Sequence, residues 1–188
     1  IRQETENAKK GLPSGITVKV NSLVDPKIIE LLYEASKAGV RVQLIVRGIC
    51  CLIPGIEGVS ENITVMSIVG QLLEHSRIFR FENAGNPRIY MGSADWMPRN
   101  LDRRVELVFP IEDETQKTRA FGILDTMLSD TTNARFMQSD TSYEHVDLRG
   151  KKKISSQLTF YHEAQARLKE LQSIEKDSVL IPIHSAEE

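Results

Sequence analysis

One short stretch in the middle of the chain holds residue types that handle phosphate groups. His75 is followed two residues later by Arg77 and then by Glu82, and a turn-rich N-A-G-N-P leads on to a Gly-Ser pair and Asp95. A histidine beside an arginine, facing a phosphate, can act as a nucleophile that forms phosphohistidine or as a general acid that protonates a leaving group. The residues alone do not decide between these roles.

A local cluster of arginines adds to this chemistry. Phosphoryl transfer depends on positioning and on cations around the phosphoryl oxygens, and the planar guanidinium binds phosphate through paired hydrogen bonds. The formal net charge of the whole chain is −2, which argues against a non-specific nucleic-acid binder, so we expect no nucleic-acid partner. The seven arginines near the histidine are Arg47, Arg77, Arg80, Arg88, Arg99, Arg103 and Arg104.

Two acidic residues each allow a structural and a functional interpretation. Glu82 either orients the histidine or pairs with Arg80 or Arg88. Arg104 and Glu106 lie two residues apart on a predicted strand and therefore share a face. They form an ion pair in one interpretation; in the other, Arg104 binds phosphate and Glu106 is an orienting carboxylate.

The Gly-Ser-x-Asp element is open to similar alternatives. Gly92 and Ser93 would let a backbone approach a phosphate closely, but such a pair also simply ends a strand. Asp95 would add negative charge beside a phosphate, so we interpret it as a structural residue that caps a turn next to Trp96.

The elements that must position these residues begin with a strand–helix–strand unit. Alternating apolar residues predict a strand over residues 16–24, and Asp25 is a suitable N-cap for a helix that ends at Gly39. Residues 40–46 read as a buried strand, so the two strands should be parallel with a right-handed crossover. Arg47 then lies at the carboxyl end of the second strand, where open α/β sheets tend to bind ligands.

The rest of the pattern predicts further strands and helices of the same α/β domain. A short helical turn at Leu72 and Leu73 would deliver His75 to a β-hairpin closed by the N-A-G-N-P turn. An apolar stripe indicates a helix over residues 114–128. The further strands are predicted at residues 63–69, 78–81, 88–91, 105–109 and 134–137.

Length and composition fit one compact domain with a real core, since 40% of the 188 residues are hydrophobic. The chain starts at Ile1 rather than Met, with a charged opening segment, and we interpret it as a fragment of a longer protein. We divide it into a lead-in helix and linker over residues 1–15, the α/β domain over residues 16–153, a helix over residues 154–176 and a tail over residues 177–188.

Cysteine usage bears on location. Cys50 and Cys51 are adjacent in an apolar context, which predicts reduced core residues in a cytoplasmic protein. No apolar run approaches the roughly 20 residues that a membrane-spanning helix needs.

The order of the motif residues resembles one half of a phospholipase D site. That superfamily carries H-x-K-x4-D and then G-S-x-N, and here Arg77, Glu82 and Asp95 stand where Lys, Asp and Asn would be. Three longer stretches resemble the last domain of bacterial polyphosphate kinase: I-V-R-G-I-C-C-L-I-P-G from Ile45, L-L-E-H-S-R around His75, and S-A-D-W-M-P-R-N further on.

This resemblance spans residues 11–153 and implies a phospholipase D-like mixed sheet flanked by helices. It also implies an ATP:polyphosphate phosphotransferase, which moves the terminal phosphate of ATP reversibly onto polyphosphate through a phosphohistidine, with Mg²⁺. In that family the phosphate-carrying histidine lies in the preceding domain. His75 would thus be the second, catalytic histidine; Arg47, Arg77 and Arg104 would bind phosphate, and no residue is assigned as a metal ligand.

The implied partners follow from the same resemblance. They are ATP and ADP, inorganic polyphosphate and the preceding catalytic domain of the same chain, and the full-length enzyme is expected to form a homo-oligomer. Its expected location is the cytoplasm, either free or associated with a membrane as part of the full-length enzyme. Because the fragment lacks the nucleophile, we expect it to be inactive alone.

Two other functions remain as alternatives. The first is a phosphodiesterase or nuclease of the phospholipase D type, in which two single-motif chains dimerise to complete a site. The second is a polyphosphate- or nucleotide-binding module without catalysis. A nuclease hydrolyses a phosphodiester, the kinase needs ATP and yields ADP, and a binding module turns over nothing.

Overall fold

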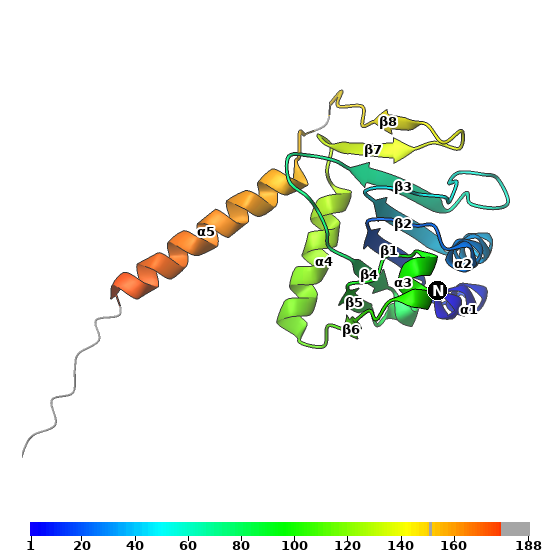
Figure 1. Ribbon diagram of the computed structural model, residues 1–188, viewed down its shortest axis with the longest axis horizontal. Helices are drawn as coiled ribbons and strands as arrows, with labels where there is room; N and C mark the ends of the chain where they lie inside the picture. The colour runs from blue at the N-terminus through cyan, green and yellow to red at the C-terminus, as the bar shows by residue number, and fades with distance from the viewer. Residues whose placement is uncertain (151, 178–188) are drawn as a thin grey trace, which may run out of the picture.

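The computed structural model describes residues 1–150 and 152–177, which form one open sheet with helices on both of its faces (Figure 1). The sheet has eight strands in the order β6-β5-β4-β1-β2-β3-β7-β8. The strands are β1 (Gly15–Val20), β2 (Arg41–Val46), β3 (Ile63–Ile68), β4 (Ile78–Phe81), β5 (Arg88–Gly92), β6 (Val108–Pro110), β7 (Ala134–Met137) and β8 (Tyr143–His145). The helices are α1 (Arg2–Lys9), α2 (Pro26–Lys37), α3 (Pro98–Arg103), α4 (Glu114–Leu128) and α5 (Ser156–Asp177), with one 3₁₀ turn, η1 (Asn83–Gly85).

The strand–helix–strand unit forms as predicted. The Asp25 carboxylate accepts a hydrogen bond from the Ile28 amide at 2.9 Å, which caps the first turn of α2. Gly39 has a φ of +89°, a left-handed conformation that suits glycine and turns the chain after the helix. β1 and β2 are parallel, with Val20 opposite Val46. Their carboxyl ends therefore meet at the same edge of the sheet.

The antiparallel neighbours of β1 bring two more segments to this edge. β4 runs antiparallel to β1, with Ile78 opposite Lys19, and β5 runs antiparallel to β4, with Met91 opposite Ile78. The amino end of β4 and the carboxyl end of β5 thus lie beside the ends of β1 and β2. We call this the functional edge: the residues that follow β1, β2 and β5 and those that precede β4.

Helices cover the two faces of the sheet and enclose a core on each side. Figure 1 shows α1 and α2 on one face and α4 on the other. Val18 and Leu44 belong to the core on the α2 side, whereas Ile45 and Ile78 belong to the core with Leu124 of α4. The predicted α/β class, a mixed sheet flanked by helices, is confirmed.

The C-terminal part of the described chain leaves the body as a long helix. α5 starts beside α4 and projects outward in Figure 1. It starts at Ser156, inside the helical segment predicted over residues 154–176, and α1 lies inside the predicted lead-in over residues 1–15. The predicted tail after Asp177 lies outside the described residues. None of the described helices is both long and apolar enough to cross a membrane.

Several predicted details are wrong. The chain makes no helical turn at Leu72 or Leu73. The strand predicted over residues 105–109 is shorter, because the backbone of Leu107 is tied to Ser93 and strand pairing starts only with Val108 opposite Gly92. Helix α3 and strand β8 were not predicted.

The cysteine prediction is half right. Both cysteines are free, but only Cys50 is partly buried. Burial raises the pKa of the Cys50 thiol to about 11, while Cys51 is exposed and so is not a core residue.

Candidate functional site

His75 lies exposed just before β4, in direct contact with Arg77. Nη1 of Arg77 lies 2.9 Å from Nδ1 of His75 and also donates to the His75 carbonyl at 2.9 Å. A guanidinium can only donate, so the ring nitrogen that it bonds must accept, and Nη2 of Arg77 also lies 3.4 Å from Nε2 of the ring. The adjacent Arg77 charge lowers the pKa of His75 below its usual value, with smaller contributions from partial burial and from Arg47.

Asp95 holds Arg77 in this position. Its carboxylate accepts from Arg77 Nη2 at 2.9 Å and Nε at 3.3 Å, and from the Asn21 amide at 2.7 Å. Asp95 is only 5% exposed, so burial raises the pKa of the carboxyl, but hydrogen bonds from Arg77, Asn21 and Ser22 outweigh this and leave the pKa below its usual value. The structural role predicted for Asp95 is correct, although its partner is Arg77.

Asn21 extends the network to Arg47. It follows β1, donates from Nδ2 to Asp95 at 3.3 Å, and accepts from Nε of Arg47 at 3.1 Å. The Nη nitrogens of Arg47 have no hydrogen-bond partner among the residues that the structure describes. One continuous chain of contacts, Arg47–Asn21–Asp95–Arg77–His75, therefore runs along the functional edge and leaves the fork of Arg47 free for a ligand.

Two residues of this edge were missed in the sequence. Asn21 follows β1 as Arg47 follows β2, so the predicted parallel pairing was a signal that could have found it. Lys19 is 1% exposed on a strand of alternating apolar residues, and a lysine at such a position is unusual. Its Nζ donates to the carbonyls of Glu74 at 3.3 Å and Ser76 at 3.2 Å, on either side of His75.

Glu106 and the Gly-Ser pair fix the segment before β6. The Glu106 carboxylate accepts from the hydroxyl of Ser93 and the amide of Asn100, and these bonds lower its pKa below the usual value. A Cβ on Gly92 would stand 2.3 Å from the Leu107 carbonyl. The close approach that needs this glycine is therefore to backbone of the same chain.

Arg104 occupies the end of α3 and not a strand. It lies near enough to Glu106 for its charge to contribute to the lowered pKa of that carboxyl, but the two form no ion pair among the described residues. The predicted shared strand face is wrong, and Arg104 is exposed, with no partner for its guanidinium in the described part of the chain. Its proposed role in phosphate binding stays a prediction.

Other predicted candidates lie away from His75. Glu82, at the far end of β4, binds Arg80 at 2.9 Å, as its structural interpretation supposed. Arg80 also reaches Asp125 at 3.4 Å and stacks over the Phe121 ring. Arg88 is the first residue of β5, at the end of that strand away from the functional edge. The structure gives Glu82 no contact with His75 within the described chain.

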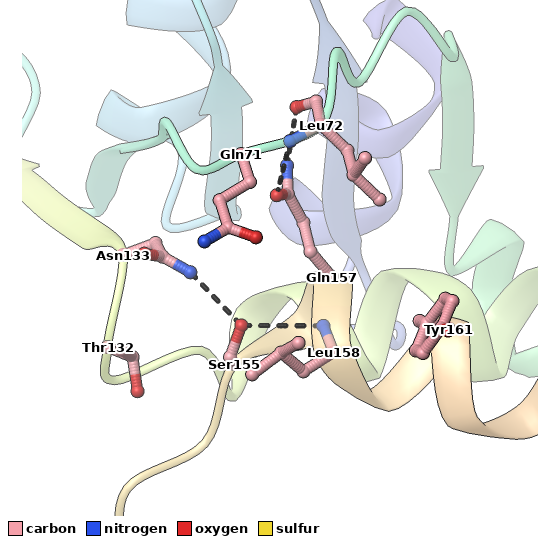
Figure 2. A pocket seen from close by; sticks show the side chains of 8 residues that line it. All are labelled: Gln71, Leu72, Thr132, Asn133, Ser155, Gln157, Leu158 and Tyr161. Carbon is pink, nitrogen blue, oxygen red and sulfur yellow. Dashed lines mark hydrogen bonds between the residues drawn. The ribbon is translucent and has the colours of Figure 1, made fainter.

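The first turn of α5 contacts the segment that carries His75. The Gln157 side chain accepts from the Leu72 amide at 2.9 Å and donates to the Leu72 carbonyl at 2.7 Å. Figure 2 shows this pair of bonds. Gln157 and Leu72 line a cavity of about 370 Å³ together with Gln71, Asn133 and Tyr161. A Cβ on Gly70 would meet the Gln157 side chain at 2.4 Å, so glycine is needed there. The helix thus anchors the loop before β4.

The described residues do not offer a ready metal site. They contain no group of three or more His, Cys, Asp or Glu side chains that could hold an ion. Asp95 at the functional edge is bonded to Arg77, and Glu106, which precedes β6, is bonded to Ser93 and Asn100. The arrangement is instead suited to an anion, because Arg47 and His75 present nitrogen donors to one open edge.

Comparisons with known proteins identify the family of the chain. The family model described as polyphosphate kinase C-terminal domain 2 matches residues 1–157. The polyphosphate kinase of Lactiplantibacillus plantarum is 54% identical over 169 residues, which cover 90% of this chain and 24% of that protein. The polyphosphate kinase of Escherichia coli K12 is 46% identical over 161 residues, which cover 86% of this chain and 23% of that protein.

A solved structure shares the fold. The crystal structure of polyphosphate kinase from Porphyromonas gingivalis superposes with a TM-score of 0.84 at 38% identity, over 88% of this chain and 26% of that one. The chain spans about a quarter of the length of these relatives. It belongs to the polyphosphate kinase family and corresponds to that family's C-terminal domain 2.

Proposed function

We propose that this chain holds phosphate groups during the reversible transfer of the terminal phosphate of ATP to polyphosphate, as part of a longer polyphosphate kinase. The observation that carries the proposal is the connected set Arg47–Asn21–Asp95–Arg77–His75 at one sheet edge. Family membership supports the same reading. ATP, ADP and polyphosphate are accordingly the proposed substrates and products.

Within this function, Arg47 and His75 are the groups that meet phosphoryl oxygens. The free fork of Arg47 suits two parallel hydrogen bonds to phosphate. Arg77 has all three guanidinium nitrogens engaged with Asp95 and His75, which favours a role in orienting His75 over direct phosphate binding. Arg104 remains a proposed outer phosphate ligand.

The nucleophile is proposed to come from the preceding domain of the same chain. A nucleophilic histidine there would attack the terminal phosphorus of ATP, and the bond to the ADP oxygen would break. His75 would stabilise the charge that develops on the phosphoryl oxygens or return a proton to the leaving oxygen. A bound phosphate opposes the effect of Arg77, so the pKa of His75 should rise when the site fills.

Magnesium enters this proposal with the substrate. Mg²⁺ prefers oxygen ligands from phosphates, water and one or two carboxylates. The carboxylates of Asp95 and Glu106 are already engaged, so we propose that the ion arrives bound to the nucleotide phosphates. We also propose that the full-length enzyme is a homo-oligomer and works in the cytoplasm. The two free cysteines suit such a reducing compartment.

The test is whether the chain turns over ATP alone. We expect no sustained ADP release from ATP, Mg²⁺ and a polyphosphate primer with the 188-residue chain, because it brings a single motif histidine. A full-length polyphosphate kinase that carries this sequence should release ADP under the same conditions. Sustained turnover by the chain alone that disappears in His75→Ala would mean that His75 is itself the nucleophile, against the proposal.

A further inference from the structure

Lys19 is a buried cation that the proposed chemistry does not use. It lies on β1 between Ile45 and Ile78 in the strand register, on the side of the sheet that α4 covers. It is 1% exposed, and its Nζ donates to the carbonyls of Glu74 and Ser76 and more weakly to Val20 at 3.5 Å. No carboxylate lies within ion-pair distance of it among the described residues. Its partners are thus backbone carbonyls.

These contacts surround His75. The carbonyls of Glu74 and Ser76 bind Lys19, while the carbonyl of His75 itself binds Arg77 at 2.9 Å. Three consecutive carbonyls are therefore held by two cationic side chains, one on β1 and one just before β4. The segment has no helical or strand hydrogen bonding of its own, so these side chains fix where the imidazole stands.

We propose that Lys19 is a positioning residue for His75, which it holds in place for phosphoryl transfer by binding the backbone on both sides of it. This inference rests on the proposed function. Burial of an ammonium is costly, and a methionine would fill the same volume without that cost. The contacts that compensate for the cost are those that fix residues 74–76.

The surroundings of Lys19 define its charge state. Burial lowers its pKa to about 8; the Glu74 and Asp95 charges raise the pKa, while the Arg47 and Arg77 charges lower it. Lys19 is thus still cationic at neutral pH and loses its proton within the range that enzymes tolerate. The neutral amine has two donors in place of three and binds carbonyls less strongly.

Because Lys19 is buried and bound to backbone, its loss should change catalysis more than substrate binding. Misplacing a catalytic group by about 1 Å can cost roughly 100-fold in rate. In a full-length polyphosphate kinase that carries this sequence, we expect Lys19→Met to lower kcat at least tenfold and to leave the KM for ATP within about twofold. The exposed Lys27→Met on α2 is the matched control and should change neither value.

His75→Ala, measured in the same enzyme, separates the two claims. If His75→Ala is inactive and folded Lys19→Met keeps wild-type kcat, the positioning role is wrong while the proposed function stands. If His75→Ala keeps full activity, the proposed function itself fails. A rise in KM without a fall in kcat would also contradict the positioning role, because it would place Lys19 in substrate binding.

A measurement on the unaltered chain covers the case in which Lys19→Met does not fold. NMR of the 188-residue chain is followed as the pH rises through the pKa of Lys19, about 8. We expect the amide signals of residues 74–76 and the ring signals of His75 to shift with one midpoint near that pH. Absence of any such shift, while Lys19 itself titrates, would overturn the proposal.

Discussion

At the scale of residues, the exchange of two motif positions changes the charge of the site. The phospholipase D pattern has a lysine and an asparagine where this chain has Arg77 and Asp95. Lysine and arginine carry the same charge, so only the change from asparagine to Asp95 alters it, and the added carboxylate forms an ion pair with Arg77 at 2.9 Å, with the Arg77 and Asp95 side chains 12% and 7% exposed. Two nitrogens of the guanidinium also lie 2.9 and 3.4 Å from the ring nitrogens of His75. A lysine has one side-chain nitrogen and would not orient the ring through two.

Asp95→Asn tests the weight of this pair. Removing one partner of a buried pair leaves Arg77 unbalanced, so we expect the free energy of unfolding near pH 7 to fall by about 3 kcal/mol. Because the folded pKa of Asp95 lies below 3.8, its stabilisation is present above that pH and is lost as pH falls through the folded pKa. Urea unfolding over this range should show a weaker acid dependence for the variant.

The matched control is Asp125→Asn. Asp125 also pairs with an arginine, Arg80, but at 3.4 Å and with a side chain that is 62% exposed. We expect the free energy of unfolding to fall by less than about 1 kcal/mol in this variant. Equal losses in the two variants would show that burial of the Asp95 pair contributes nothing.

Arg47→Ala tests the phosphate ligand. Titration of the chain with tripolyphosphate should show binding that is weaker by roughly 10- to 100-fold, because a charge-assisted hydrogen bond contributes roughly 1.5–3 kcal/mol. Arg41→Ala, an exposed arginine at the opposite end of the same strand β2, should bind as the unaltered chain does. Both affinities should fall with added salt. Equal affinities of the two variants would remove Arg47 from the site.

At the scale of elements, sequence patterns predicted the strands and the helix that position the site but not the side-chain contacts between distant segments. The apolar alternation and the helix cap of the β1–α2–β2 unit correctly placed Arg47 at the carboxyl end of a parallel strand. The contact of Lys19 with Ser76 joins residues 57 positions apart, and that of Leu72 with Gln157 joins residues 85 positions apart. Local periodicity carries no signal for either contact. The prediction of a helical turn before β4 is wrong for this reason. Side chains from β1 and α5, and not a helical turn, form hydrogen bonds with the backbone of this segment.

Two glycine substitutions test whether Gln157 of α5 restrains the loop before β4. Gly70→Ala places a methyl group 2.4 Å from the Gln157 amide, which must move and give up its bonds to Leu72. We expect the free energy of unfolding to fall by about 1–2 kcal/mol in urea titrations. Gly122→Ala, in the exposed middle of α4 with open space around it, should instead raise it by about 0.5–1 kcal/mol. Stabilisation by both changes would mean that Gln157 does not restrain the loop.

At the scale of the whole molecule, the site is one open edge. His75 is exposed, and Arg47 keeps unpaired donors there. The chain spans about a quarter of the length of its relatives. An anion bound at this edge would keep most of its water unless a second surface closed over it, and charge stabilisation is strongest where water is excluded. We therefore expect the proposed reaction to need a second surface beside this edge, and we place the test of His75 in a full-length enzyme.

The deciding variants are His75→Ala and His75→Gln in a full-length polyphosphate kinase that carries this sequence. His75→Ala should abolish polymer synthesis, since it removes both the hydrogen bond to phosphate and the proton donor. Glutamine still donates a hydrogen bond but cannot deliver a proton near neutral pH, so general acid catalysis predicts a loss of roughly 100-fold or more in kcat for His75→Gln. His145→Ala, on the edge strand β8 far along the sheet from β4, should leave the rate unchanged. Activity of His75→Gln near that of the unaltered enzyme would refute proton donation by His75 and leave phosphate binding as its role.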